Sequence, residues 1–342
     1  MANQIIVSTE GAMGVIALNR PEAINALSAE MILGVTEALT LWRDDPAIGA
    51  VLFEGRGGKG FCAGGDVRAA RALVLAGHQD AATAYFAAEY RINAMIAAYP
   101  KPVIALTSGI VMGGGIGIAG HCGFRISQPG ARFAMPESAI GFFGDVGVNA
   151  ILAKAPLNRA LLFLMSGVSV GVADALGLGL ADCMVAPEQL MDMRAGIGAA
   201  ASATDPQSTL VRQMEAHSIV AGKEMFCALA DLLPPEPPTS PQDFVERVAA
   251  IPVLEEIDGL LKTRSPTALT AIFYSHLAAR SLMAVQPTLE MDLRLAALMS
   301  GLPDFAEGVR AVLVDKDNRP AWHPQHLAEV DPRPILRAIK GA

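Results

Sequence analysis

The chain has few cysteines and no excess of positive charge, and each shortage excludes a class of protein. Its four cysteines among 342 residues lie far apart, with no Cys-x-x-Cys pair and no neighbouring pair of histidines. This pattern predicts neither a disulfide framework nor a zinc site, and reduced thiols point to a cytoplasmic location. Lys and Arg number 26 against 34 Asp and Glu, a net charge of −8. We therefore expect no nucleic-acid partner, because such proteins carry a broad basic surface.

The sequence also lacks the hydrophobic runs of signal peptides and membrane spans. Residues 1–11 have neither a basic segment nor a long apolar one, so no secretory signal peptide is expected. Residues 102–120 are uncharged and approach the roughly 20 residues of a membrane span. Six of them are glycines, however, and glycine is a poor helix former. We therefore predict a buried strand, a loop and a buried helix there, and no membrane partner.

What the chain does have is apolar content for a large core and an alternating pattern of strands and helices. Apolar residues make up 52 % of the sequence, and its length suggests about two domains. Alternation to about residue 190 predicts an α/β fold, whereas helical periodicity dominates beyond residue 200. We thus predict a core at 1–200 and a mostly helical region at 201–342. Strands are expected at residues 4–9, 13–19, 48–53, 103–106, 124–127 and 132–134, and helices at 81–98 and 158–166.

Several polar residues are placed where helices are expected to begin. Ser28 precedes a helical apolar stripe, and Ser265 precedes a proline at the first helical position. Asp66 is a predicted cap for the helix after a glycine-rich loop, and Asp304 is one for a helix that runs toward Val309. Five prolines between residues 234 and 241 predict a rigid linker or surface loop.

Two motifs match well-known signatures, but neither has the required context. The GxGxxG at 115–120 needs a strand directly before it to place a dinucleotide, and the predicted strand ends near residue 106. The GxSxG at 167–171 needs a strand before its serine, and a helix is expected there instead. We interpret Ser169 as the N-cap of a helix at 170–176.

A less generic pattern consists of two glycine clusters and two carboxylates. The loop KGFCAGGD at 59–66 is followed about 50 residues later by glycines 113–115, at the start of an apolar helix. Each cluster can present a backbone N–H without an obstructing side chain, and two such groups that converge form an oxyanion hole. Glu137 and Asp145 come next in the sequence. Turns and close packing are the competing explanation for the glycines.

The carboxylates and nearby thiol also have plain structural explanations. Glu137 follows a proline and suits the first turn of a helix, Asp145 suits an N-cap, and Glu89 suits a solvated helix face. Cys62 has no histidine close in sequence to activate it and is expected to be a packed thiol. We expect His121 to be a packed core residue, and the six histidines form no recognisable metal set.

Taken together, these motifs resemble those of the crotonase (enoyl-CoA hydratase/isomerase) superfamily over roughly residues 4–200. The resemblance implies a spiral of ββα units that binds an acyl-CoA and holds the thioester carbonyl by two backbone amides. By position in the motifs, these amides belong to Gly65 and Gly114. The motifs are NRP at 19–21, NAL at 25–27, FCAGGD at 61–66, KPVIAL at 101–106 with Gly109, MGGG at 112–115 and FAMPE at 133–137.

Within the superfamily, nearly the whole chain resembles the 3-hydroxyisobutyryl-CoA hydrolase subfamily, whose members act in valine catabolism. The sequence departs from that pattern at Gly144, where proline is usual, and after Gly147, where more glycines are usual. A looser loop there is expected to move Asp145 or reshape the pocket. The motifs are EY at 89–90, MGGGIG at 112–117, AMPESAIG at 134–141, DVG at 145–147, SPTAL at 265–269, MDLRL at 291–295 and DFAEGVRAVLVDKD at 304–317, with Trp322.

The resemblance favours a thioester hydrolase over a hydratase. A hydratase of this superfamily uses two glutamates, one of which falls at Gly117, while the other falls at Glu137. The hypothesis is that Glu137 attacks the thioester or activates water, and that Asp145 binds the 3-hydroxyl or moves a proton. Glu89, by resemblance, contacts the acyl end. The geometric expectation is that the two amides meet at one oxygen within reach of Glu137.

Alternatives from other classes remain open at this point. They are an enoyl-CoA hydratase or isomerase, a non-catalytic CoA-binding protein, and a nicotinamide-dependent oxidoreductase. We expect an acyl-CoA as substrate, no cofactor beyond the CoA of that substrate, no metal, and a homo-oligomer as one option for assembly. Arg20 and Lys59 are candidates by position for contacts with the CoA phosphates.

Overall fold

The computed structural model describes residues 3–223 and 225–341, which fall into two compact units. The first, here called the sheet unit, comprises Met1–Gly65, Arg91–Phe133 and Val170–Glu224. The second, the helical unit, comprises Asp66–Tyr90, Ala134–Ser169 and Met225–Ala342. The predicted boundary at residue 200 lies inside helix α8 (Leu190–Ala201) of the sheet unit, and as a domain limit it stays a prediction.

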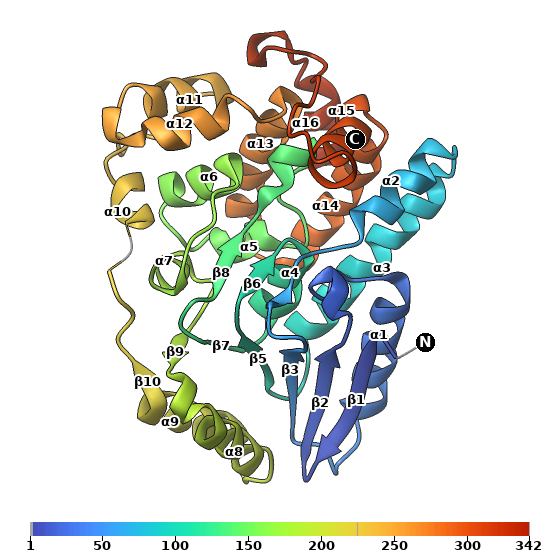
Figure 1. Ribbon diagram of the computed structural model, residues 1–342, viewed down its shortest axis with the longest axis vertical. Helices are drawn as coiled ribbons and strands as arrows, with labels where there is room; N and C mark the ends of the chain where they lie inside the picture. The colour runs from blue at the N-terminus through green and yellow to red at the C-terminus, as the bar shows by residue number, and fades with distance from the viewer. Residues whose placement is uncertain (1–2, 224, 342) are drawn as a thin grey trace. The chain divides into compact units, whose positions relative to one another are not determined.

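The sheet unit is built on a seven-stranded sheet in the order β1-β2-β3-β5-β7-β9-β10 (Figure 1). Neighbours from β2 to β9 are parallel, and the two outermost pairs are antiparallel. The strands are β1 (Ile5–Glu10), β2 (Met13–Leu18), β3 (Ala50–Gly55), β5 (Val103–Thr107), β7 (Phe124–Ser127), β9 (Cys183–Val185) and β10 (Ser218–Ile219). The strands predicted from residue 4 to residue 127 are therefore confirmed to within one or two residues.

A second, smaller sheet is formed by strands that alternate along the sequence with those of the large sheet. It has three strands in the order β4-β6-β8, namely β4 (Gly60–Cys62), β6 (Ile110–Met112) and β8 (Arg132–Ala134). Each pair of consecutive strands, β3–β4, β5–β6 and β7–β8, thus contributes one strand to each sheet. This repetition of paired strands confirms the expected α/β spiral of ββα units.

Helices cover the large sheet with apolar faces that the sequence spacing predicts. Helix α1 (Ala29–Arg43) begins at Ser28, whose side chain accepts a hydrogen bond from the Met31 amide at 3.2 Å, as expected of an N-cap. Its Trp42 ring lies so close to β2 that a Cβ on Gly14 would be 2.7 Å from the ring. Helices α8 and α9 (Pro206–His217) bury residues such as Met193 and Leu210 in the same core as the strands.

The uncharged segment at 102–120 is not a membrane span. It forms β5, β6 and helix α4 (Gly114–His121), all within the sheet unit. Among the described residues, no helix combines the length and the apolarity that crossing a bilayer requires. The prediction of a buried strand, a loop and a buried helix is therefore confirmed, with one strand more than expected.

The helical unit contains two short segments that carry, or directly follow, the predicted carboxylates Glu137 and Asp145. These segments are the 3₁₀ helix η2 (Pro136–Ile140) and helix α5 (Val148–Leu152). The helices α13, α14 and α16 pack against one another (Figure 1). Its longer helices are α2 (Val67–Leu75), α3 (Gln79–Ala97, whose last residues belong to the sheet unit), α6 (Leu157–Ser166), α11 (Pro241–Ala249), α12 (Glu255–Leu261), α13 (Pro266–Leu282), α14 (Val285–Ser300), α15 (Pro303–Val309) and α16 (Arg333–Lys340).

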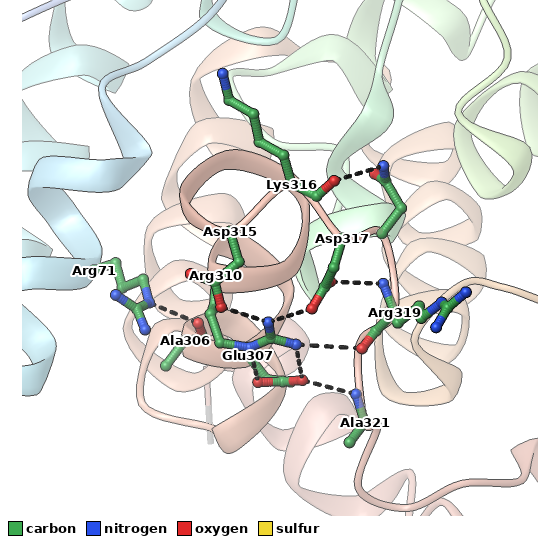
Figure 2. Close-up of polar contacts among 10 residues, drawn as sticks. Arg71, Ala306, Glu307, Arg310, Asp315, Lys316, Asp317, Arg319 and Ala321 are labelled. Carbon is green, nitrogen blue, oxygen red and sulfur yellow. Dashed lines mark hydrogen bonds and ion pairs between the residues drawn. The ribbon is translucent and has the colours of Figure 1, made fainter.

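An arginine at the end of α15 ties the following loop to that helix. The Arg310 guanidinium donates to Glu307 at 2.8 and 2.9 Å and to Asp315 and Asp317 at 2.7 Å each, as Figure 2 shows. Arg71 of α2 donates to the Ala306 carbonyl at 2.7 Å. Helix α15 in turn packs so tightly on η2 that a Cβ on Gly308 would lie 2.4 Å from the Ile140 carbonyl carbon. These contacts fix the backbone on which Glu137 sits.

Two further predicted helix starts are confirmed, and the one at Asp304 is wrong. Asp66 caps α2 through the Ala69 amide at 3.2 Å, and Ser265 caps α13 through the Ala268 amide at 3.0 Å. Asp304, in contrast, lies inside the first turn of α15 and caps nothing there. Its carboxylate accepts from the Ser265 hydroxyl at 2.5 Å and from the His323 amide at 2.7 Å, because burial brings those distant donors to it.

Candidate active site

The two glycine loops of the sheet unit meet because their preceding strands are paired. Strands β4 and β6 run parallel, so their carboxyl ends lie at the same edge of the small sheet. A Cβ on Gly64 would lie 3.6 Å from the Gly114 nitrogen. The two loops therefore lie side by side, whereas the convergence of the Gly65 and Gly114 N–H groups on one oxygen stays a prediction; we call these two groups the amide pair.

The N–H groups of this pair, those of Gly65 and Gly114, are not used by the hydrogen bonds of the described residues. Gly114 is the first residue of α4, where the helix itself offers no acceptor. The dipole of the helix also favours negative charge at that end. Two unused N–H groups on adjacent loops are the arrangement that stabilises a thioester oxyanion.

The competing explanation for the glycines holds for other members of the same clusters. Gly64 has φ of 116° and Gly113 has φ of 49°, conformations that favour glycine. A Cβ on Gly115 would lie 2.4 Å from the Cys62 carbonyl oxygen. Turns and close packing therefore explain three glycines, and they are what allows the amide pair to form.

Asn25 holds the first glycine loop in place, a role that sequence reasoning did not assign. Its amide nitrogen donates to the carbonyls of Arg56, Gly60 and Phe61 at 3.0, 3.2 and 3.1 Å. Asn25 itself has φ of 57°, a left-handed conformation that Asn adopts more readily than most residues. The signal that can find such a residue is an Asn in a short turn beside a glycine-rich loop.

The neighbouring thiol is packed, as expected. The Cys62 side chain is fully buried and donates to the Asn25 carbonyl at 3.1 Å. It therefore braces the turn and takes no part in chemistry that the structure indicates.

In the helical unit, four buried carboxyl groups form what we call the carboxylate cluster. Glu89 lies on α3, Glu137 on η2, Asp145 in the turn before α5 and Asp292 on α14. Their exposed fractions are 2, 8, 6 and 0 %. The alternative of a solvated face for Glu89 is therefore wrong, because its helix packs that face inward, and its contact with the acyl end stays a prediction. Asp292 was not predicted as a site residue, although its motif was recognised.

The turn that carries Asp145 has an unusual backbone fixed by partners from distant elements. Val146 and Gly147 have φ of 54° and 72°. The Gly147 amide donates to Asp292 Oδ2 at 2.8 Å, and the Tyr90 hydroxyl donates to Asp145 Oδ2 at 2.7 Å. The alternative of Asp145 as a mere N-cap is wrong, since α5 begins at Val148 with Gly147 as its cap residue. Strained turns of this kind persist where the surroundings over-determine them.

The same turn is tied back at Gly144, where a looser loop was expected. The Asn149 amide donates to the Gly144 carbonyl at 2.7 Å. The side-chain oxygen Oδ1 of Asn149 lies 3.0 Å from Nδ1 of His276, which is fully buried on α13. Burial, together with nearby Arg280, lowers the pKa of His276 to about 3, so this histidine is neutral. The two positions that depart from the subfamily pattern are thus joined by a hydrogen bond.

Burial raises the pKa of every carboxyl group in the cluster. Desolvation raises the pKa of Glu89 to about 8 and that of Asp145 to about 7, the latter held down by the Tyr90 hydrogen bond. The pKa of Glu137 is raised well above its usual value by desolvation and then by the charge of Asp145. Stacked aromatic rings help to exclude water, with Phe86 and Phe142 centroids 5.2 Å apart. Perturbed acids that face one another are typical of catalytic sites.

The structure also shows where the two generic motifs and His121 lie. The strand before GxGxxG was missed, since β6 ends at Met112, directly before the glycines. Ser169 is not an N-cap, because α7 (Val172–Leu178) begins after Gly171 and Val170 bridges Phe133 instead. His121 is buried, as expected. Among residues 3–223 and 225–341, no group of three His, Cys, Asp or Glu side chains is arranged to hold a metal.

Comparison with known proteins decides the family. The profile of the enoyl-CoA hydratase/isomerase family matches residues 13–339. The chain belongs to this family. The membership confirms the resemblance seen in the motifs and accounts for the ββα spiral.

Curated members of the family align with almost the entire chain. A protein of Xenopus tropicalis named 3-hydroxyisobutyryl-CoA hydrolase, mitochondrial, is 36 % identical over 343 residues, which cover 96 % of this chain and 86 % of that protein. Arabidopsis thaliana 3-hydroxyisobutyryl-CoA hydrolase 1 is 32 % identical over 342 residues, covering 96 and 89 %.

Solved structures of the family share the whole fold. A carnitinyl-CoA dehydratase from Mycobacterium thermoresistibile has a TM-score of 0.88 at 32 % identity, covering 98 % of this chain and 96 % of its own. An enoyl-CoA hydratase from Rhodobacter sphaeroides has a TM-score of 0.88 at 29 % identity, covering 98 and 97 %.

Proposed function

We propose that this member of the enoyl-CoA hydratase/isomerase family hydrolyses the thioester of a short, branched 3-hydroxyacyl-CoA such as 3-hydroxyisobutyryl-CoA, releasing the free acid and CoA. Two curated relatives that align with 96 % of the chain carry the name of this activity. The observation that supports it most is chemical. Glu137 and Asp145 belong to one buried cluster. The charge of Asp145 raises the pKa of Glu137, and the Tyr90 hydrogen bond partly lowers the pKa of Asp145.

In the proposed reaction, the amide pair binds the thioester oxygen and stabilises the negative charge that develops on it. Glu137 then attacks the carbonyl carbon, the C–S bond breaks, and CoA leaves as a thiolate that takes up a proton. Water cleaves the resulting anhydride. In the alternative course, Glu137 removes a proton from water, and that water attacks the carbonyl carbon directly.

The remaining acids of the cluster have supporting roles in this proposal. Asp145 binds the 3-hydroxyl of the acyl group or shuttles a proton, and Glu89 contacts the acyl end. Helix α4 has no side chain at Gly117, where the resemblance to hydratases calls for a glutamate. A two-glutamate addition of water to a double bond therefore lacks one of its groups.

The experiment is an assay of CoA release. Purified protein with 3-hydroxyisobutyryl-CoA and a thiol reagent should yield free CoA, and Glu137→Gln should abolish most of that yield. Glu256→Gln, a matched change on the exposed face of α12, should keep it. No CoA release by the unaltered protein would exclude the hydrolase. Weak turnover that Glu137→Gln leaves unchanged would favour a non-catalytic CoA-binding protein.

Hydration or dehydration of an acyl-CoA is the second candidate. It is favoured by the two solved structures with TM-scores of 0.88, which are titled dehydratase and hydratase. Loss of enoyl absorbance with crotonyl-CoA, without release of a thiol, would select it over hydrolysis. A nicotinamide-dependent reaction predicts instead a thermal shift on addition of NAD(H).

The proposal extends to partners and location. It includes a cytoplasmic site of action, a role in valine catabolism, no cofactor beyond the substrate's own CoA, and a homo-oligomer as one option for assembly. Cell fractionation tests the location, which the "mitochondrial" in the name of the Xenopus relative makes worth testing. Activity after chelation tests the cofactor statement, and light scattering measures the assembly.

A further inference from the structure

The four acids of the carboxylate cluster differ in how their oxygens are hydrogen-bonded. Glu89 Oε1, Glu137 Oε2 and Asp292 Oδ1 are each buried with no donor among the described residues. Asp145 has no such atom, and its Oδ2 accepts the Tyr90 hydroxyl at 2.7 Å. A buried carboxylate ion needs donors, whereas a neutral carboxyl group tolerates an unpaired oxygen better. A negative charge therefore costs least on Asp145.

The surroundings of Asp145 allow few charges at once. Tyr90 and Glu89 face it from α3, Glu137 from η2 and Asp292 from α14. The other titratable groups nearby are His276, which is neutral, and the charged Arg280, both on α13. Arg294 is also near, and its charge acts on Asp292. Acids this close ionise one after another, because the first charge opposes the next. The pKa values of about 7 for Asp145 and about 8 for Glu89 give the same order.

We propose that Tyr90 is a positioning residue: its hydroxyl directs the first negative charge of the cluster to Asp145, and Glu137 thereby stays protonated until an acyl-CoA binds. This inference rests on the proposed function for its kinetic consequence only. When Glu137 becomes the attacking group, its O–H bond breaks and the proton forms an O–H bond on Asp145. The total charge of the cluster is unchanged by this transfer.

The first test needs no substrate. Carbon-13 NMR of Asp and Glu carboxyl carbons in the resting protein should show that the first group of the cluster to ionise is an aspartate, absent from the spectrum of Asp145→Asn. In Tyr90→Phe, Asp145 should ionise at higher pH by about half a unit or more, and a glutamate should ionise earlier. Tyr99→Phe is the matched control, since that hydroxyl donates to the Leu39 carbonyl at 2.7 Å in the sheet unit.

A glutamate that ionises first in the unaltered protein would overturn the inference, and so would an unchanged order in Tyr90→Phe. If Tyr90→Phe does not fold, Asp145→Asn decides instead. With the competing charge removed, Glu137 should ionise at lower pH, and no shift would contradict the inference.

The second test is kinetic. Tyr90→Phe should move the acid limb of kcat/KM for CoA release to higher pH, because Asp145 must lose its proton before it can take one from Glu137, and without the Tyr90 hydroxyl it loses that proton at higher pH. A merely structural role for Tyr90 would lower the rate equally at every pH. If the protein releases no CoA from any acyl-CoA, the proposed function fails, while the NMR titration still decides where the first charge lies.

Discussion

The amide pair and the carboxylate cluster differ in the chemical groups that form them. The amide pair consists of backbone N–H groups on glycines, with no ionisable atom, and its geometry is set by close packing such as that of Gly115 on Cys62. The carboxylate cluster consists of four ionisable side chains whose geometry depends on partners from α3 and α14. Steric change should therefore disable the first, whereas pH and charge should govern the second.

The largest effect should come from the carboxylate cluster. Glu137→Gln keeps the size of the side chain and removes its nucleophilic or basic oxygen. We expect kcat/KM for CoA release to fall roughly 10³-fold, within the range attributed to a positioned base. The assay with a thiol reagent measures it, and an equal loss in Glu256→Gln would show that the effect is not specific to the cluster.

The amide pair should respond to added bulk. Gly115→Ala puts a Cβ against the Cys62 carbonyl oxygen, which separates the two loops. We expect the rate to fall about 10²-fold, as when one oxyanion donor is lost, with the shape of the pH profile unchanged. Gly123→Ala is the control, because its Cβ would meet nothing closer than 3.9 Å. A changed pH profile in Gly115→Ala would contradict the separation of roles.

The support of the amide pair should be measurable as stability. Asn25→Ala removes three hydrogen bonds to buried carbonyls and a residue suited to its left-handed φ. Denaturant unfolding should show a loss of about 2–3 kcal/mol, on the usual scale of roughly 1 kcal/mol for each hydrogen bond. Asn318→Ala, also at a left-handed φ but exposed, should cost far less. Equal losses would mean that the backbone angle alone matters.

The smallest effect at any one step of the experiment is expected on the pH dependence of stability, where the change is small for each unit of pH. The pKa of Glu89 is raised to about 8 in the folded protein, so folding favours its protonated form. The stability that this provides is complete below the unfolded pKa and is lost as pH rises through about 8. Between pH 5 and 8, the unfolding free energy of the unaltered protein should fall faster than that of Glu89→Gln by up to about 1 kcal/mol per pH unit. Parallel curves would place Glu89 outside the cluster electrostatics.

Local patterns made most of the sheet unit predictable. Apolar runs gave strands β1, β2, β3, β5 and β7, while β4 lies in a segment predicted as a loop, and serine or aspartate before an apolar stripe gave the starts of α1, α2 and α13. Strand β6 was missed because it has only three residues between a Gly and a glycine run. The convergence of the two glycine loops came from the motifs, and the pairing of β4 with β6 supplies its physical cause.

The contacts between distant elements were not predictable. Tyr90 and Asp292 lie 55 and 147 residues from Asp145, and no local pattern marks them as its neighbours. Asp304 looked like a helix cap because the sequence does not reveal that its carboxylate accepts hydrogen bonds from the Ser265 hydroxyl and the His323 amide instead. Glu89 looked solvated on an alanine-rich helix for the same reason, since burial of that helix face is set by packing.

The packed thiol beneath the glycine loops offers a built-in reporter. Cys62 is fully buried, donates to the Asn25 carbonyl and has Gly115 directly above its peptide. An alkylating reagent reaches its sulfur only during moments when the loops part. The labelling rate of the peptide that contains Cys62 therefore measures how often the amide pair opens, and a bound acyl-CoA should lower that rate.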